Sequence, residues 1–567
     1  MCANAQTGIG KTLAYLAPAV RAAADGKTVV ISTHTVQQVR QIEAEARRLG
    51  TDIAVRLGRA NFFSPNRIKR WLANADDRDS ETVQQLRDAL NFTDTIDDFE
   101  VQYGPLLATR SDVCLTLACR DQGGYEAQRD VVGSASIVIQ SHAMTIIDVT
   151  RDELSADIVI YDEGDALPAA ATGFAEYRVT DYDLQVILDR YERDGLEEAV
   201  GAFLTWASSA LGDKDCLFKQ HDLDVEKLAS ALREALTGIE DDHVRDVRRS
   251  LGAFVNLDPT LPYRGAAVVK DRGRFGFVVV ANDPARVLRR TYPGRKSLFV
   301  SATLGVDTSD FQPFRRLVGA ETFDHKHDCR IDIGNFGSMA FTLADRDMPK
   351  PFGDDGKRQA GFDDYAADIV KAARTKGGRV LVLATSFEDV EQIASRVPGI
   401  IAHLRGEKLV GHLETFKASQ DAVLVTPSAW AGVDLPGLLS HVVILRVPFA
   451  PQEAARIELL RALLASRGIG GANAERILFA RNRENMIRKL AQGHGRGIRR
   501  ETDSVRMWIA DPRFPLPAAL VRNPRLLLEQ GAALKMVDLA KAIPVRFADA
   551  YAAAEIFYVG GKTVDAA

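Results

Sequence analysis

Short runs of aliphatic and β-branched residues recur along the chain, and a helical pattern follows most of them. Such runs predict buried strands, and their alternation with helices predicts parallel sheets of the α/β class. The runs form two sets: Thr28–Ser32, Ser136–Gln140, Asp157–Tyr161 and Ser297–Ser301, then Arg379–Ala384, Ala422–Thr426, His441–Arg446 and Val505–Ala510. Two sets of strands indicate two sheets, and therefore two α/β lobes.

Two long segments interrupt the first set without this rhythm. Residues 58–130 and 176–284 have mainly helical patterns, and the second ends in a predicted hairpin over Ala266–Ala281. The segment Asp345–Asp364 is rich in glycine, proline and charge, as linkers are. We therefore expect lobe 1 in residues 1–57, 131–175 and 285–340, insertions in 58–130 and 176–284, and lobe 2 in 341–567.

Composition narrows the class of protein. The 567 residues exceed what one core usually fills, so several domains are expected. With 72 basic and 77 acidic residues, the chain has no general attraction for polyanions, and a nucleic acid must bind in a local groove. Five scattered cysteines argue against a disulfide framework. Without a secretory leader or an apolar run of about 20 residues, no membrane association is expected, and the prediction is a soluble cytoplasmic protein.

Residues 5–12 have the pattern of a phosphate-binding loop, and they are Ala5, Gln6, Thr7, Gly8, Ile9, Gly10, Lys11 and Thr12. The glycines let backbone amides point at phosphate oxygens, and the following helix adds its positive end. Lys11 would meet the β- and γ-phosphates of ATP, and Thr12 would offer its hydroxyl to Mg²⁺. The alternative is a glycine-rich turn that only starts a helix.

An acidic cluster follows the predicted strand at Asp157–Tyr161. In an open α/β sheet the carboxyl ends of the strands are where ligands bind. There Asp162 would hold Mg²⁺, and Glu163 would orient and deprotonate the attacking water. The alternative is a solvated turn or helix cap, but the preceding phosphate loop favours the metal site.

A basic segment near the C-terminus, Gln492–Arg500, completes the predicted site. Arg496 and Arg499 are three residues apart, so a helix would place both on one face. Guanidinium groups match the phosphoryl oxygens of a transition state, and such arginine fingers raise rates by about 10³–10⁵. Gln492 and the glycines around it indicate a shaped loop, with a basic surface stretch as the alternative.

Taken together, these residues resemble a known family, the superfamily 2 helicases of the DinG and XPD type. The resemblance spans nearly the whole chain. Nine segments carry it in order: AQTGIGKT (5–12), VVISTHT (29–35), GRANFF (58–63), IVIQSHAMTIID (137–148), IVIYDEGD (158–165), FVSATLG (299–305), GRVLVLATS (378–386), PSAWAGVDLPG (427–437) and QGHGRGIRR (492–500).

Similarity to this family implies ATP-dependent 5′→3′ movement along single-stranded DNA, with unwinding of duplex ahead. It implies that Ser301 and Thr303 couple the nucleotide state to the grip on DNA, and that Gly432 and Asp434 lie between nucleotide and strand. Thr385 and Ser386 lie in another matched segment and are expected at the DNA. Gln492, Arg496 and Arg499 are expected to act with Lys11 and Glu163 in catalysis.

Single-strand binding needs phosphate donors and aromatic faces for stacking. Thr33 and Thr35 are candidate donors at the end of a strand, with His34 between them. Trp430 is a candidate for base stacking, with core packing as an equal alternative. His34 and His142 fit hydrogen-bonded structural histidines better than metal ligands.

Two features depart from the family pattern. Members commonly hold an iron–sulfur cluster through four cysteines, the first directly after the GRANFF-like stretch, where this chain has Ser64. Cys114 and Cys119 keep the spacing of two later ligands, but two thiolates do not hold a cluster, so we expect none. At the N-terminus only Met1–Asn4 precede the loop. We therefore expect a stunted first strand without the usual adenine-contacting segment, or a true start further upstream.

A cysteine-poor, compact DinG-like chain resembles the DinG proteins encoded with type IV CRISPR systems. The implied partner is a crRNA-guided effector complex, whose displaced strand supplies the loading site. Three alternatives stay open: a stand-alone repair helicase, a translocase that strips protein or RNA without unwinding duplex, and an adaptor that has lost nucleotide binding.

Overall fold

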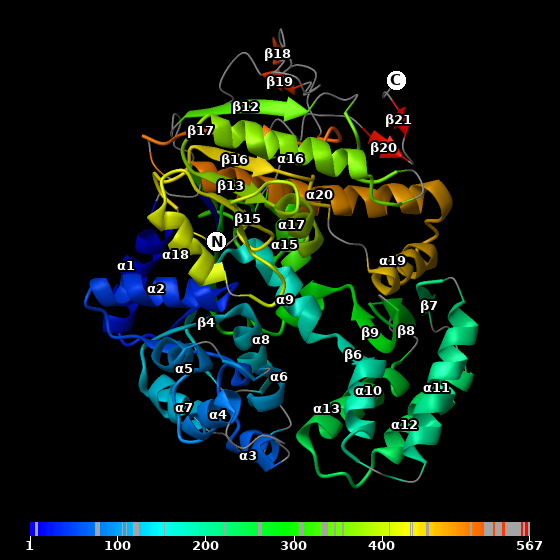
Figure 1. The fold of residues 1–567 in the computed structure, drawn as a ribbon. Helices are drawn as coiled ribbons and strands as arrows, with labels where there is room; N and C mark the ends of the chain where they lie inside the picture. The colour runs from blue at the N-terminus through cyan, green and yellow to red at the C-terminus, as the bar shows by residue number, and fades with distance from the viewer. Residues whose placement is uncertain are drawn as a thin grey trace.

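The chain forms two α/β lobes with two insertions in the first lobe (Figure 1). A computed structural model describes residues 1–564 apart from 6–9, 74–79, 105, 109, 117–118, 120–123, 152–153, 192, 194, 213, 219–222, 259–262, 272, 305–310, 332–337, 345–347, 354–355, 408, 431–432, 434, 450–452, 499, 501, 515–524, 528–535, 539–556 and 560–561. Seven predicted site residues therefore lie outside the described residues: Gln6, Thr7, Gly8, Ile9, Gly432, Asp434 and Arg499.

Lobe 1 is built on a seven-stranded parallel sheet in the order β11-β1-β10-β5-β2-β4-β3. Its strands are β1 (Cys2–Ala5), β2 (Val29–Thr33), β3 (Ala54–Arg56), β4 (Ile137–Ser141), β5 (Ile158–Asp162), β10 (Lys296–Ser301) and β11 (Cys329–Ile331). The helices that flank it are α1 (Lys11–Ala24), α2 (Val36–Arg48), α8 (His142–Arg151), α9 (Leu167–Phe174), α14 (Pro284–Leu288) and α15 (Gln312–Val318).

The first strand, β1, is short but internal to the sheet. It pairs with β10 on one side and β11 on the other, and Cys2 donates its backbone N–H to Asp328 at 2.8 Å. Arg315 is buried and pairs with the same Asp328 carboxylate at 2.7 Å. The expected stunted strand is therefore a four-residue strand that pairs with a neighbour on each edge and is also hydrogen-bonded to Asp328.

Lobe 2 has an eight-stranded sheet in the order β14-β15-β13-β16-β17-β12-β19-β18, parallel except at its β12-β19-β18 end. Its strands are β12 (Ser338–Ala344), β13 (Val380–Leu383), β14 (Ile401–Ala402), β15 (Val423–Thr426), β16 (His441–Ile444), β17 (Ser504–Ile509), β18 (Arg525–Leu527) and β19 (Met536–Asp538). Its helices are α16 (Ala360–Thr375), α17 (Phe387–Ala394), α18 (Leu409–Ala418), α19 (Ala454–Ser466) and α20 (Gly471–Gly497). A small hairpin, β20 (Phe557–Val559) and β21 (Lys562–Val564), stands apart from this sheet.

Both sheets are covered on both faces, which explains the continuous apolar runs in the sequence. Along β13, Leu381 and Leu383 enter one hydrophobic cluster while Val380 and Val382 enter another. All eight predicted strands are confirmed to within two residues at each end, and so is the α/β class. One boundary differs, because β12 crosses the expected division at 340/341 and pairs along its length with β17 of lobe 2.

The first insertion is helical. It contains η1 (Arg59–Asn61), α3 (Pro65–Ala73), α4 (Glu81–Ala89), α5 (Ile96–Tyr103), α6 (Arg110–Val113) and α7 (Gly124–Ser134). A separate apolar cluster centred on Phe63, Ile68 and Phe99 forms its core.

The second insertion combines helices with a four-stranded antiparallel sheet in the order β6-β9-β8-β7. Its elements are β6 (Tyr177–Thr180), α10 (Asp181–Leu188), α11 (Leu196–Leu211), β7 (Cys216–Phe218), α12 (Leu223–Ala235), α13 (Asp242–Val255), β8 (Arg264–Asp271) and β9 (Arg274–Ala281). The predicted hairpin is thus confirmed as β8 and β9. The expectation of a mainly helical segment did not include this sheet, because β6 and β7 are too short to show alternation.

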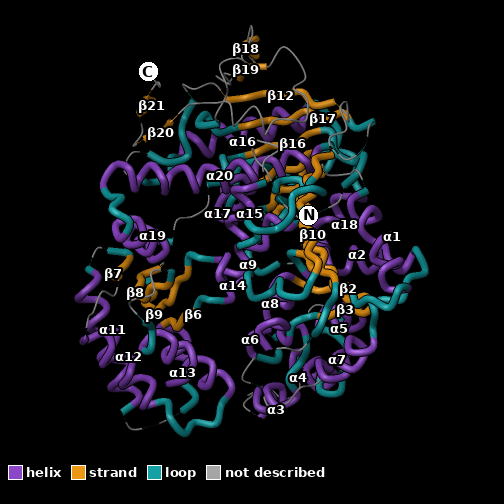
Figure 2. The backbone as a smooth tube through the Cα atoms, turned by 180° about the vertical axis from the view of Figure 1, so that it is seen from behind, coloured by secondary structure: helices purple, strands orange, loops and turns teal. Residues whose placement is uncertain are grey.

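One face of that sheet packs against lobe 2. Val269 and Val280 of the insertion share a hydrophobic cluster with Ala455 and Leu459 of α19. Arg456 on the same helix pairs with Glu176 at 3.0 Å. Viewed from behind, α19 lies over β7 and β8 at the end of the long helix α20 (Figure 2). The insertion is therefore covalently part of lobe 1 but packs on lobe 2.

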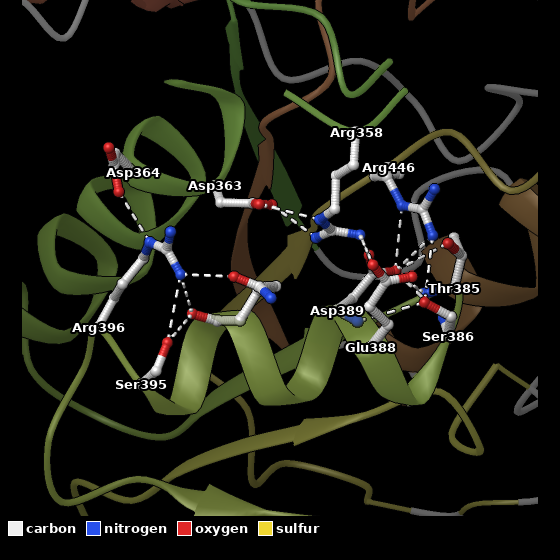
Figure 3. A network of polar contacts seen from close by, with 11 residues as sticks. Arg358, Asp363, Asp364, Thr385, Ser386, Glu388, Asp389, Ser395, Arg396 and Arg446 are labelled. Atoms are coloured by element: carbon white, nitrogen blue, oxygen red, sulfur yellow. Dashed lines mark hydrogen bonds and ion pairs between the residues drawn. The ribbon is translucent and has the colours of Figure 1, made fainter. Parts of the chain in front are cut away.

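A polar network in lobe 2 fixes the start of α17 (Figure 3). Ser386 caps this helix in a capping box with Asp389, and Thr385 also donates its hydroxyl to Asp389 at 2.9 Å. Arg358 and Arg446 approach the same buried carboxylate at 2.9 and 2.8 Å. Asp389 therefore joins β13, α17 and the segment before α16.

We expect Asp389→Asn to lower the free energy of unfolding by about 3 kcal/mol, because it leaves two partly buried guanidiniums facing a neutral amide. Urea unfolding followed by circular dichroism measures this change. Asp364→Asn is the matched control. Its carboxylate pairs with Arg396 at 2.7 Å but is largely exposed, so a loss of at most about 1 kcal/mol is expected. Equal losses in the two variants would contradict the assignment.

The same comparison has a pH dependence. Burial acts to raise the pKa of Asp389, but Arg446 and Arg358 outweigh it and hold that pKa below its ordinary value of 3.8. A lowered pKa stabilises the fold above the unfolded-state value, and this contribution is lost as the pH falls through the folded-state value. We therefore expect the gap in unfolding free energy between wild type and Asp389→Asn to be constant above pH 3.8 and to shrink below it.

Candidate active site

The residues that flank the predicted phosphate loop lie at the carboxyl edge of the lobe 1 sheet. Ala5 ends β1 and is buried, and Lys11 and Thr12 open the first turn of α1. Gly10 caps the helix with φ 82°, a left-handed conformation that glycine adopts without strain. The N-terminal end of α1 therefore faces this edge of the sheet, where its dipole favours an anion.

The predicted acidic residues lie at the same edge. Asp162 is the last residue of β5, which pairs between β10 and β2. Glu163 follows in a left-handed conformation, with φ 50° and ψ 48°, and leads into η2 (Gly164–Ala166). Lys11 Nζ lies 3.2 Å from Glu163 Oε1. The structure thus brings the predicted lysine and the predicted base into contact across 152 residues of sequence.

The two adjacent carboxylates differ in their surroundings. Burial raises the pKa of Asp162 to about 7, and the charge of Glu163 adds to the rise. Burial acts on Glu163 in the same direction, but Lys11 and a hydrogen bond from Ser301 outweigh it, so the pKa of Glu163 lies below its ordinary value. A buried carboxylate with a raised pKa gains from a nearby cation. Asp162, with Thr12 on the facing helix, therefore fits the oxygen ligands that Mg²⁺ prefers.

Asp165 connects this site to the rest of the molecule. The Ser301 hydroxyl lies 2.6 Å from Asp165 Oδ1 and 2.9 Å from Glu163 Oε2, so the two carboxylates share its proton, and Thr303 donates to Asp165 at 2.6 Å. From lobe 2, Gln492 of α20 donates to the same carboxylate at 3.3 Å. The lobes therefore meet at the acidic cluster through one hydrogen bond between side chains that are 327 residues apart.

Residues 492–497 are the last turns of α20, so the expectation of a shaped loop was wrong for this stretch. Gly493 in this stretch is explained by close packing and not by a loop. A Cβ at Gly493 would lie 2.7 Å from the ring of Trp430. Only glycine therefore lets α20 pack this closely against Trp430. Arg496, on the same end of α20, is buried and donates to the backbone carbonyls of Trp430 and Val433. Its charge also acts on Glu163 across the interface.

Most residues predicted to bind DNA are engaged within the protein. Thr33 is buried beside Asp162, with Oγ1 3.5 Å from its carboxylate, and Thr35 caps α2 in a capping box with Gln38. His34 between them is exposed. Ser301 and Thr303 face Asp165, as described above.

In lobe 2, Thr385 and Ser386 belong to the cap of α17 (Figure 3). Trp430 is 3% exposed and donates its indole N–H to the Ala384 carbonyl at 2.6 Å. Trp430 therefore packs in the core, which was the alternative to base stacking, and Lys489 Nζ lies 5.4 Å from its ring centroid.

The sequence analysis missed two parts of this site. Asp165 lies within the predicted acidic segment, but nothing in the pattern showed that Ser301, Thr303 and Gln492 converge on it. His142 was interpreted only as a structural histidine. It is fully buried beneath Glu163, and burial lowers its pKa to about 3, so the imidazole is neutral. No periodicity or spacing could have revealed either contact, because both join separate strands.

The residues at the positions where the resemblance implies iron–sulfur ligands are engaged within the first insertion. Ser64 is fully buried and caps the start of α3, accepting the Arg67 backbone N–H at 3.3 Å. Cys119 accepts the Thr116 backbone N–H at 3.1 Å, and Cys114 packs in the insertion's apolar core. Within the described residues, no group of three or more histidine, cysteine, aspartate or glutamate side chains is arranged for a metal ion.

Comparisons with known proteins agree with this architecture. The DEAD/DEAH box helicase family model matches residues 1–79, and the helicase C-terminal domain model matches 369–522. ATP-dependent helicase DinG of Mycobacterium tuberculosis H37Rv is 25% identical, with 90% of this chain and 87% of that protein covered. ATP-dependent DNA helicase YoaA of Escherichia coli K12 is 24% identical, with 90% and 88% covered.

The fold is also that of solved helicases. An XPD helicase structure superposes with a TM-score of 0.58 at 16% identity and covers 90% of this chain and 92% of its own. A structure of apo XPD gives a TM-score of 0.57 at 14% identity. Among the described helices, none is long and apolar enough for a membrane span. With both helicase family models matched on the two lobes that share this site, the chain is an ATP-dependent helicase, similar in sequence to DinG and YoaA.

Proposed function

We propose that this helicase hydrolyses ATP with Mg²⁺, moves 5′→3′ along single-stranded DNA and unwinds duplex ahead of it. The observation that carries the proposal is the unbroken line of polar contacts from Lys11 through Glu163, Ser301 and Asp165 to Gln492. This line begins at the phosphate loop in lobe 1 and ends in lobe 2. A change at the nucleotide is therefore transmitted directly to the contact between the lobes.

Lys11 neutralises Glu163 in the structure described here. Phosphate oxygens of ATP would compete for the lysine, and Glu163 would then be free to accept a proton from the attacking water. Asp162 and Thr12 would hold Mg²⁺, which supplies positive charge to the phosphates when bound. Arg496 acts electrostatically on Glu163 from lobe 2, and its guanidinium would have to leave the Trp430 and Val433 carbonyls to reach the γ-phosphate.

DNA as the polymer is supported by the relative YoaA, whose name is that of a DNA helicase. Opening a base pair costs about 1.4 kcal/mol on average, a modest load for one ATP per base. Exposed His34 at the end of β2 is the best placed of the predicted DNA contacts. Thr33, the residue before His34, contacts Asp162. A DNA strand bound at His34 would therefore lie close to the proposed Mg²⁺ site.

The partnership with a crRNA-guided type IV CRISPR effector complex has its support in the sequence resemblance alone. A stand-alone repair helicase accounts equally well for similarity to DinG and YoaA. The same holds for a translocase that strips protein or RNA from the strand. The adaptor is disfavoured by the contact between Lys11 and Glu163, which a protein without nucleotide turnover does not need.

Phosphate release stimulated by single-stranded DNA tests the hydrolytic site. We expect Lys11→Ala and Glu163→Gln each to lose at least about 10²-fold in kcat, since one removes the phosphate contact and the other removes the base. Lys27→Ala is the matched control, because Lys27 forms only an exposed ion pair with Asp157 in the same lobe, at 3.4 Å. Equal and negligible rates in wild type and Lys11→Ala would support the adaptor instead.

Strand displacement tests direction and unwinding. We expect release of the annealed strand from a duplex with a 5′ single-stranded tail, and none from a duplex with a 3′ tail, when ATP and Mg²⁺ are present. Release from the 3′-tailed duplex would contradict the direction. ATP hydrolysis on the 5′ tail without release of the strand would favour the translocase. Parallel reactions with RNA tails report the choice of polymer.

A further inference from the structure

A chain of buried polar side chains lies directly beneath the catalytic edge of lobe 1. His142 is its central member, and it opens α8 with no exposed surface. Its Nε2 lies 3.3 Å from the backbone carbonyl of Glu163, and its Nδ1 lies 2.8 Å from Ser32 Oγ. The imidazole thus bridges β2 and the residue that follows β5.

The partners fix which ring nitrogen carries the proton. A carbonyl only accepts hydrogen bonds, so Nε2 must be the donor to Glu163 and Nδ1 must be the acceptor from Ser32. Ser32 Oγ in turn accepts from Thr145 at 2.8 Å, and Thr145 accepts from Gln140 at 3.1 Å. The Thr145 hydroxyl also lies 3.2 Å from the Ser141 carbonyl, which competes with Ser32 for its single proton.

The far end of the series is anchored by charge. Gln140 also donates to Asp148 at 2.8 Å, and Asp148 pairs with Arg56 at 2.7 Å, with both side chains buried. Arg56 ends β3, and Asp148 lies on α8. This buried ion pair ties α8 to β3, the edge strand of the lobe 1 sheet.

Glu163 needs such support because of its backbone. Among the described residues it is the one residue other than glycine with a positive φ. Side chains in the left-handed region are strained, and the conformation persists only where the surroundings enforce it. The Glu163 carbonyl accepts two hydrogen bonds, from Ala166 N–H at 2.9 Å and from His142. With the backbone held, the carboxylate points to Lys11 and Ser301.

We propose that His142 is a positioning residue for ATP hydrolysis, which holds the Glu163 backbone in its left-handed conformation and so aims the carboxylate at the attacking water. The inference rests on the proposed role of Glu163 as the base. It predicts that loss of the Nε2 donor lowers turnover and leaves ATP affinity unchanged, because the hydrogen bonds of the ring go to Ser32 and the Glu163 backbone and not to Lys11.

The test compares two amides at position 142. Asparagine places its amide near the Nδ1 position, so His142→Asn keeps the contact with Ser32 and does not reach Glu163. Glutamine is longer, and His142→Gln restores a donor near the Nε2 position. Since a misplaced catalytic group can cost about 10²-fold in rate, we expect that loss of kcat in His142→Asn with KM for ATP unchanged, and substantial recovery in His142→Gln.

His403 in lobe 2 provides a matched control. It is equally buried, with Nδ1 2.8 Å from the Thr426 hydroxyl and Nε2 2.9 Å from the Glu407 carbonyl. His403→Asn therefore removes the same kind of hydrogen bond away from the site, and we expect it to keep the wild-type kcat. Thermal unfolding of both variants shows whether each is folded at the assay temperature.

Two results would overturn the inference: an unchanged kcat in His142→Asn, whatever its KM for ATP, or an equal loss of kcat in His403→Asn. If His142→Asn does not fold, Ser32→Ala takes its place, because it leaves the ring but removes the group that orients it. We expect kcat to fall there too, and full activity would overturn the inference. Wild-type turnover in Glu163→Gln would contradict the proposed role of Glu163 as the base. Loss of turnover in Glu163→Gln together with full turnover in His142→Asn would contradict only the role of His142.

Discussion

The structure depends on the placement of three acidic side chains, Asp162, Glu163 and Asp165, at one buried edge of a parallel sheet. Like charges this close are costly unless cations and hydroxyl donors surround them. Lys11, Ser301 and Thr303 meet that need from lobe 1, and Gln492 contributes from lobe 2. The segments that carry these side chains are distant in sequence, so compensation of the acidic cluster also specifies how α1, β10 and α20 approach β5.

Much of the fold follows from local pattern. Strands buried on both faces are continuous apolar runs, and eight of them were recognisable with their order along the chain. The strands that were missed are short ones such as β3 and β11, or ones such as β12 that complete a sheet without a strong run of their own. The division between the lobes moved for the same reason, since β12 joins lobe 2 by pairing with β17 and not through its composition.

The site was predictable in its parts but not in its connections. A lysine after glycines and an acidic pair after a strand have chemistry that can be read from the sequence, and the structure brings Lys11 and Glu163 into contact. The glycine at 493 was misinterpreted, because a glycine that permits close helix packing looks the same in sequence as one that shapes a loop. His142 and Asp165 act through tertiary contacts that no one-dimensional signal encodes.

The docking of α19 on the β6–β9 sheet has a mechanical consequence. The insertion leaves lobe 1 after α9 and returns to it before α14, yet Ala455 and Leu459 of lobe 2 are embedded in its sheet. A rotation of one lobe against the other would therefore either bend these two connections or separate the hydrophobic cluster that the insertion shares with α19. An insertion that keeps this cluster intact would move with lobe 2, although the chain connects it to lobe 1 at both ends.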